Sequence, residues 1–167
     1  SSDEAKLLTQ PQKDLCTACH DDKVGFPHMH GPASAGDCTA CHTPHESDIK
    51  PLLLKKDNDV CFGCHVDLEE LVKKPDVHPA LDGGCTSCHN PHGSAHPKLL
   101  PEEGAGVCFT CHDEIGQKVQ TSPVVHGAVK SEKGCASCHS PHASDNAKLL
   151  LAPQKDTCLS CHKTIVT

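Results

Sequence analysis

The chain has 167 residues, of which 36% are hydrophobic and only 3 are aromatic, all of them Phe. Ordinary globular chains are roughly 45–50% apolar, so the side chains alone would make a poor core. The net charge of −7, the lack of any Arg and the scarcity of aromatic rings exclude nucleic-acid binding, and no stretch approaches the ~20 apolar residues of a membrane span.

All 14 cysteines fall in Cys-x-x-Cys pairs, and a His directly follows each pair. In chain order the motifs are Cys16, Cys19 and His20; Cys38, Cys41 and His42; Cys61, Cys64 and His65; Cys85, Cys88 and His89; Cys108, Cys111 and His112; Cys135, Cys138 and His139; and Cys158, Cys161 and His162. In C-x-x-C-H, both thiols bind the vinyl groups of haem and the imidazole is the proximal ligand of the iron. Zinc sites and disulfide frameworks also use cysteine pairs, but neither explains a His in all seven motifs. The pattern predicts seven covalently attached haem c groups.

Two types of motif alternate in the order ABABABA. Type B continues as C-x-x-C-H-x-P-H, whereas a leucine pair and a polar stretch precede each type A motif, as at Leu7-Leu8 and Leu149-Leu150. A pair of motifs is therefore one structural repeat. The sequence predicts one domain, spanning 1–167, with repeats at about 7–51, 52–98 and 99–148 and a half repeat at 149–167.

The sequence predicts short helices and turns. A helical pattern follows the A motifs at Val66 to Val72 and around Ile115 and Val119, while 13 Pro and 12 Gly interrupt the rest. Dividing 167 residues among seven motifs leaves about 24 per haem, too few to wrap a porphyrin. We expect a mostly irregular fold with short α-helices and little or no sheet, in which an extended array of haems is the core and folding depends on haem attachment.

Eight histidines lie outside the motifs, and seven haems need seven second axial ligands. Six of the eight recur in register, three in Pro-x-x-His before a B motif and three in the x-P-H tail. The predicted distal ligands at these positions are His30, His78, His126, His45, His92 and His142. His28 and His96 lie outside this template; His28 is favoured as the seventh ligand, and His96 is the alternative.

The x-P-H histidines are expected to bind the iron of a neighbouring haem. His45 lies three residues after the proximal His42, too close for the chain to pass around the porphyrin. Spacing does not say which distal His serves which haem. Met29 is the only methionine and lies between two histidines, so we expect bis-His ligation throughout, which implies low potentials because an axial Met is what raises them.

The three B motifs read CTACHTPH, CTSCHNPH and CASCHSPH, at 38–45, 85–92 and 135–142. With them the chain resembles multihaem c-type cytochromes with doubled C-x-x-C-H motifs, including the subunits of extracellular cytochrome nanowires. The resemblance implies electron transfer to redox proteins or extracellular acceptors rather than enzymatic catalysis. A soluble periplasmic carrier remains an alternative, and so does a multihaem reductase, although the altered C-x-x-C-K motif or Tyr that often marks an open haem is absent.

Covalent haem implies export, to the cell exterior or surface or else to the periplasm. The opening Ser1-Ser2 without Met fits a processed N-terminus. The last A motif, at His162, has no B motif after it, and an uncapped repeat predicts head-to-tail association with other copies. In that filament, His28 would be donated to a haem of the neighbouring copy; a monomeric carrier is the alternative.

Overall fold

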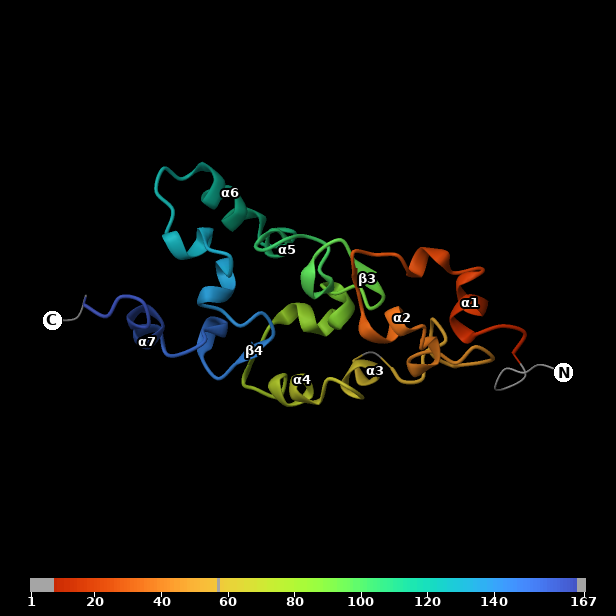
Figure 1. The fold of residues 1–167 in the computed structure, drawn as a ribbon. Coiled ribbons are helices and arrows are strands. Elements are labelled where there is room, and N and C mark those ends of the chain that lie inside the picture. The colour runs from red at the N-terminus through yellow and green to blue at the C-terminus, as the bar shows by residue number, and fades with distance from the viewer. Residues whose placement is uncertain (1–7, 57, 165–167) are drawn as a thin grey trace. The chain divides into compact units, whose positions relative to one another are not determined.

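The computed structural model describes residues 8–56 and 58–164, so Leu7 and the ends of the first and last repeats lie outside the described residues. Short helices joined by turns make up most of this part of the chain (Figure 1). The α-helices are α1 (Gln12–Thr17), α2 (Gly31–Ala35), α3 (Asp59–Phe62), α4 (Val66–Leu71), α5 (Gly106–Phe109), α6 (Asp113–Thr121) and α7 (Gln154–Leu159). Helices α4 and α6 lie where the sequence predicts them.

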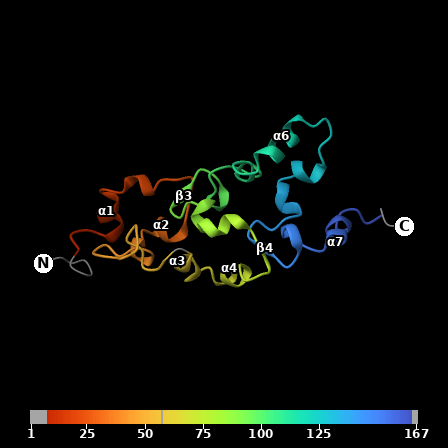
Figure 2. The same cartoon turned by 180° about the vertical axis from the view of Figure 1, so that it is seen from behind.

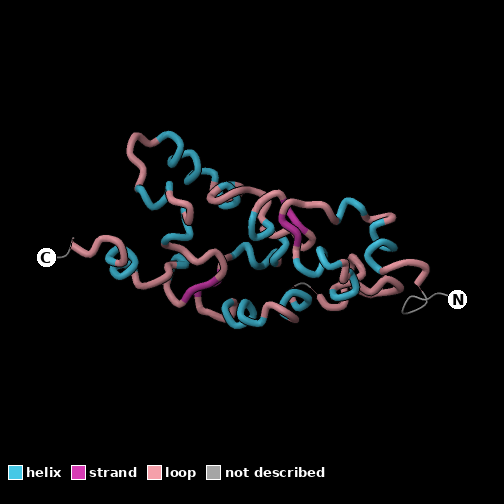
Figure 3. The backbone as a smooth tube through the Cα atoms, viewed as in Figure 1, coloured by secondary structure: helices cyan, strands magenta, loops and turns pink. Residues whose placement is uncertain are grey.

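The 3-10 helices lie between the α-helices along the chain. Figure 3 shows how short helical stretches alternate with loops. They are η2 (Asp21–Lys23), η3 (Cys38–Ala40), η4 (Pro79–Gly83), η5 (Cys85–Ser87), η6 (Pro97–Leu99), η7 (Gly127–Lys130), η8 (Gly134–Ser137) and η9 (Ala147–Leu149). The view from behind in Figure 2 shows the same short elements joined by long turns. The fold class is therefore the predicted one, mostly irregular with short helices.

The chain divides into two compact units. Unit 1 comprises Ser1–Cys61 and Cys85–Glu103, and unit 2 comprises Phe62–Gly84 and Gly104–Thr167. Each unit thus combines segments that are distant in sequence. No helix in the described part of the chain is both long and apolar enough to span a bilayer.

Each unit contains one two-residue antiparallel ladder. In unit 1, β1 (His28–Met29) pairs with β3 (Gly93–Ser94), and in unit 2, β2 (Asp76–Val77) pairs with β4 (Ala143–Ser144). In both ladders, one strand lies directly before a Pro-x-x-His histidine and the other lies directly after an x-P-H histidine. The ladder of unit 1 is closely packed, since a Cβ at Gly93 would lie 2.7 Å from Cδ2 of Phe26.

The described residues form almost no apolar core. Ala143, with 2% of its surface exposed, is the buried apolar side chain among them, and Ser94 and Ser144 are the buried polar ones. Large apolar side chains remain exposed instead, including Val124 at 86%. Because exposed apolar surface of this kind opposes folding in water, the polypeptide depends on another apolar component.

Candidate functional site

Most C-x-x-C-H motifs fold into one helical turn that brings the cysteines and the histidine together. In six of the seven, the N–H of the histidine donates to the carbonyl of the first cysteine at 2.9–3.0 Å. These first cysteines are Cys16, Cys38, Cys85, Cys108, Cys135 and Cys158. The first cysteine of every A motif lies in an α-helix, and that of every B motif lies in a 3-10 helix. All fourteen cysteines are half-buried or exposed, which fits their attachment to haem.

The third motif comprises Cys61, Cys64 and His65. The boundary between the two units follows Cys61, so this motif is divided between them. The side chains of Cys64 and His65 are exposed, and His65 serves the backbone as the residue before α4, where its carbonyl accepts the N–H of Leu68 at 3.1 Å. The structure thus places His65 at a helix start, and its assignment as a proximal iron ligand stays a prediction.

The second cysteines of two A motifs have contacts that the sequence does not predict. The hydroxyls of Thr110 and Ser160 donate to the carbonyls of Val107 and Thr157, both at 2.8 Å. Their oxygens lie 3.9 Å from Sγ of Cys111 and 3.7 Å from Sγ of Cys161. In both motifs the hydroxyl belongs to the preceding residue, so covalent spacing brings it to the sulfur. Sulfur is a weak acceptor, and these contacts leave both exposed thiols accessible for a thioether bond.

Thiols of neighbouring A and B motifs lie close together in unit 1. Burial raises the pKa of Cys61 to about 11, and the nearby Cys85 and Cys41 add to this shift. Burial also raises the pKa of Cys38, and a hydrogen bond with Cys16 adds to it. A raised pKa favours the neutral thiol over the thiolate, which is the nucleophilic form.

Three or more His, Cys, Asp or Glu side chains do not gather into a group that could hold a metal ion anywhere in residues 8–56 and 58–164. A haem iron needs only two protein ligands, one on each face of the porphyrin. Two histidine rings at a suitable distance from each other would meet this need.

The proximal histidines of the B motifs share one hydrogen bond, from Nδ1 to a backbone carbonyl nine residues further along the chain. His42 donates to Pro51 at 3.0 Å, His89 to Lys98 at 2.8 Å and His139 to Lys148 at 2.8 Å. Because a carbonyl only accepts, each Nδ1 carries the proton and Nε2 is unprotonated. This tautomer is the one that binds iron through Nε2, so these side chains fit an axial ligand.

Three predicted distal histidines lie opposite a proximal histidine. The ring centroids are 6.1 Å apart for His42 and His92, 6.1 Å for His78 and His112, and 5.9 Å for His126 and His162. With each ligand nitrogen about 2 Å from a metal ion and each ring centre about 1 Å further away, two imidazoles on opposite sides of the metal have centroids about 6 Å apart. The spacing of all three pairs therefore fits two axial ligands of one iron.

His92 and His42 form the most parallel of the three pairs, with 15° between the ring planes. Burial lowers the pKa of His92 below its ordinary value, and the proximity of His42 lowers it further. Both effects favour the neutral imidazole, which is the form that binds a metal.

The two ladders place distal histidines side by side. The N–H of His30 donates to the carbonyl of His92 at 3.0 Å, and the N–H of His78 donates to the carbonyl of His142 at 2.8 Å. Each ladder thus joins one Pro-x-x-His histidine to one x-P-H histidine through the backbone. Two distal ligands that share a backbone hydrogen bond would hold two neighbouring haems at a fixed separation.

Two of these candidates differ in how Nδ1 is bonded. Nδ1 of His30 donates to the carbonyl of Pro91 at 2.9 Å, so its proton is on Nδ1 as in the B motifs. Nδ1 of His78 instead accepts the N–H of Ala80 at 3.1 Å. The proton of a free His78 ring is then on Nε2, and it must leave for this nitrogen to bind a metal.

His45, His28 and His96 have no second imidazole at a comparable distance among the described residues. His45 is exposed. His28 lies in β1 opposite Ser94, the place that Asp76 takes opposite Ser144 in unit 2. The proximal His20 and His139 likewise have no imidazole partner in the described part of the chain.

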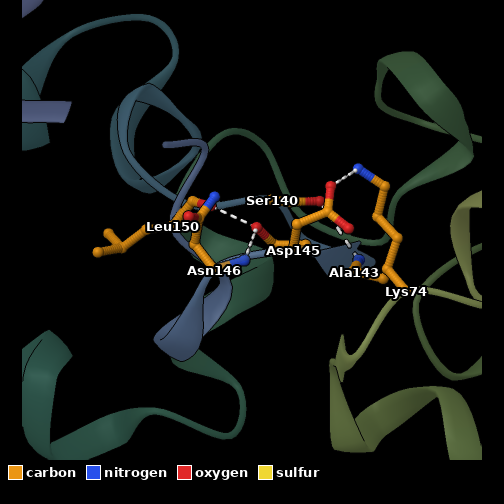
Figure 4. Close-up of polar contacts among 7 residues, drawn as sticks. Lys74, Ser140, Ala143, Asp145, Asn146 and Leu150 are labelled. Atoms are coloured by element: carbon orange, nitrogen blue, oxygen red, sulfur yellow. Dashed lines mark hydrogen bonds and ion pairs between the residues drawn. The ribbon is translucent and has the colours of Figure 1, made fainter. Parts of the chain in front are cut away.

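The B motif of unit 2 is followed by a turn that a serine closes (Figure 4). Ser144 Oγ donates to the carbonyl of Leu150 and accepts the N–H of Asn146 at 3.0 Å. Lys74 forms an ion pair with Asp145 at 2.7 Å beside this turn. Both partners of that pair are partly exposed, so it contributes less than about 1 kcal/mol.

The sequence analysis missed these turns. The chain carries a signal for them, because a serine lies six residues before a leucine after each B motif, at Ser47, Ser94 and Ser144. The sequence pattern assigns the leucine pairs to the A motif that follows. The structure instead turns Leu149 back onto its own B motif, where its carbonyl accepts the N–H of Ser140 at 2.7 Å.

The cysteine motifs of the chain match a known family. The family model described as a doubled CXXCH motif matches residues 1–25, 30–70, 78–117 and 126–167, which together are most of the chain. A search of curated proteins finds no match.

Proposed function

Because the chain belongs to the doubled CXXCH motif family, whose members are multihaem electron-transfer cytochromes, we propose that it transfers electrons through seven haem c groups. When bound, haem c supplies one-electron redox chemistry at iron. The chain supplies two thiols and a proximal imidazole for each haem, and a second imidazole that closes the other face. Iron with two axial histidines has no position for a substrate, which favours electron transfer over catalysis.

The observation that carries the proposal is the spacing of the imidazole pairs. It supports His92 as the distal ligand of the haem whose proximal ligand is His42. In the same way it supports His78 as the partner of the proximal His112, and His126 as the partner of the proximal His162. We propose the remaining template histidines, His30, His45 and His142, as distal ligands too, with His28 as the seventh and His96 as its alternative. The repeats would then form one haem-binding domain.

Intact-protein mass measurement tests the number of haems. The mass of protein from the native host is expected to exceed that of the polypeptide by seven haem groups, with all thiols consumed, those of Cys41, Cys111 and Cys161 included. In Cys88→Ser, one thioether bond is lost and denaturation is expected to release or expose one haem, whereas Ser87→Ala, the neighbouring residue of the same motif, is expected to keep all seven attached. A mass with four haems or fewer would refute the assignment.

We also propose that the protein is exported and associates end to end into an extracellular filament. The support is a match in numbers: two proximal histidines, His20 and His139, lack a second imidazole among the described residues, and so do two predicted distal ligands, His28 and His45. Histidines of a second copy would complete these haems. A heterologous contact of this kind extends indefinitely when its rotation does not close a ring.

Size-exclusion chromatography and electron microscopy of the native holoprotein test the filament. Elongated polymers that show bis-His spectra at every haem are the expected result. A monodisperse monomer at high concentration, with all seven haems low-spin, would refute the filament and favour the periplasmic carrier. It would leave the electron-transfer role intact.

A further inference from the structure

The proximal histidines of A and B motifs lie in two different environments. Those of the B motifs donate Nδ1–H to a carbonyl nine residues away. Among the described A-motif histidines, the rings of His20, His112 and His162 make no such bond. His20 and His112 instead stand directly before short helices, η2 and α6.

Backbone strain is concentrated at the carbonyls that accept the B-motif bonds. The non-glycine residues with positive φ in the described chain are Leu52, Lys98, Leu99, Lys148 and Leu149. Each of them is the acceptor residue or the one directly after it. Residues other than glycine avoid this region, and where they persist in it the surroundings enforce it.

In unit 2 the contacts that enforce the turn come from both sides. Asp76 Oδ2 accepts the N–H of Leu149 at 2.7 Å, from the ladder strand β2. The carbonyl of Leu149 accepts the N–H of Ser140, and the N–H of Leu151 donates to the carbonyl of Cys138 at 2.9 Å. Together these bonds hold the carbonyl of the preceding residue, Lys148, against the ring of the proximal histidine.

In unit 1 the corresponding turn keeps the equivalent contacts, although His28 takes the ladder position of Asp76. The carbonyl of Leu99 accepts the N–H of Asn90 at 2.9 Å, and Ser94 Oγ donates to the carbonyl of Leu100 at 2.7 Å. The strained conformation and the hydrogen bond to the ring thus recur together in both units.

We propose that these left-handed turns are positioning elements that lower the reduction potential of the B-motif haems below that of the A-motif haems. A hydrogen bond from Nδ1–H to a carbonyl raises the basicity of the imidazole, and a more basic ligand stabilises ferric over ferrous iron. Since A and B motifs alternate, lower and higher potentials alternate along the chain. The inference rests on the proposed binding of haem at these motifs.

Two substitutions at Lys148 separate the geometry of the turn from the charge of its side chain. Lys148→Gly keeps the positive φ without strain, whereas Lys148→Pro cannot adopt it, and both remove the same positive charge. In spectroelectrochemical titration, one haem of the Pro variant is expected to be reduced at a higher potential than in the Gly variant. A ten-fold loss of preference for ferric iron corresponds to a rise of about 59 mV.

Superimposable titrations of the two variants, with seven haems present in each by mass, would refute the inference and leave the proposed function standing. If Lys148→Pro does not assemble, a measurement on the unsubstituted protein tests the inference instead. In the reduced, diamagnetic holoprotein, NMR is expected to show slower exchange of Nδ1–H in the B-motif histidines, His42, His89 and His139, than in the A-motif histidines, His20, His112 and His162. Equal exchange in the two groups would also refute the inference, and a missing haem in the mass spectrum would instead refute the assignment of that site.

Discussion

Replacing His92 with alanine is expected to convert one haem of the seven from low-spin to high-spin. The His92 ring lies 6.1 Å from that of His42 and is its imidazole partner in the described part of the chain. Removing it leaves the iron with one axial imidazole and an open position. Carbon monoxide is then expected to bind the reduced variant with a stoichiometry of one, where the unsubstituted protein binds none.

His96→Ala is the matched control, because it removes a histidine four residues further along whose ring has no imidazole partner among the described residues. Its spectrum and its lack of carbon monoxide binding are expected to equal those of the unsubstituted protein. If His92→Ala stayed fully low-spin while His96→Ala opened a haem, the assignment of His92 would be wrong. The electron-transfer role itself would survive that result.

The second large effect concerns folding. Polypeptide produced without haem attachment is expected to be unfolded in reducing buffer, with a random-coil circular dichroism spectrum and rapid proteolysis. Fixing the backbone costs about 1–2 kcal/mol of conformational free energy per residue. Among the described residues, Ala143 is the one buried apolar side chain, so little burial of apolar surface offsets that cost. Haem attachment supplies the missing apolar surface, as metal binding does in small metal domains.

The holoprotein, digested under the same conditions, is the control and is expected to resist proteolysis. A cooperative thermal transition in the haem-free chain would contradict this expectation. It would mean that the exposed side chains, such as Val124 and Leu151, form a core without haem.

Local features were predictable from the sequence because their causes are local. The seven motifs are read directly from the chain, and one helical turn suffices to bring Cys16, Cys19 and His20 together. The helical pattern after Cys64 and the scarcity of long apolar runs likewise predicted α4 and a mostly irregular fold. The six template histidines were found by their register with the motifs.

Contacts of individual motif residues were less predictable. The hydroxyls near the sulfurs of Cys111 and Cys161 depend on which residue happens to precede the second cysteine, and a C-x-x-C-H pattern leaves that position open. His65, like His20 and His112, stands directly before a helix, and this place follows from how the flanking segments fold.

The imidazole partners of His42, His112 and His162 come only from the tertiary structure. His92 lies 50 residues after His42 in the sequence, and no periodicity predicts that their rings meet. The carbonyls that accept hydrogen bonds from the B-motif rings could not be predicted either. The sequence does not show the direction of a backbone carbonyl, which here depends on a strained turn. The sequence alone therefore determined the haem-binding motifs and the fold class, because both follow from covalent spacing and composition. The pairing of the predicted axial histidines and the turns that orient them depend on contacts between distant segments, which only the folded chain brings about.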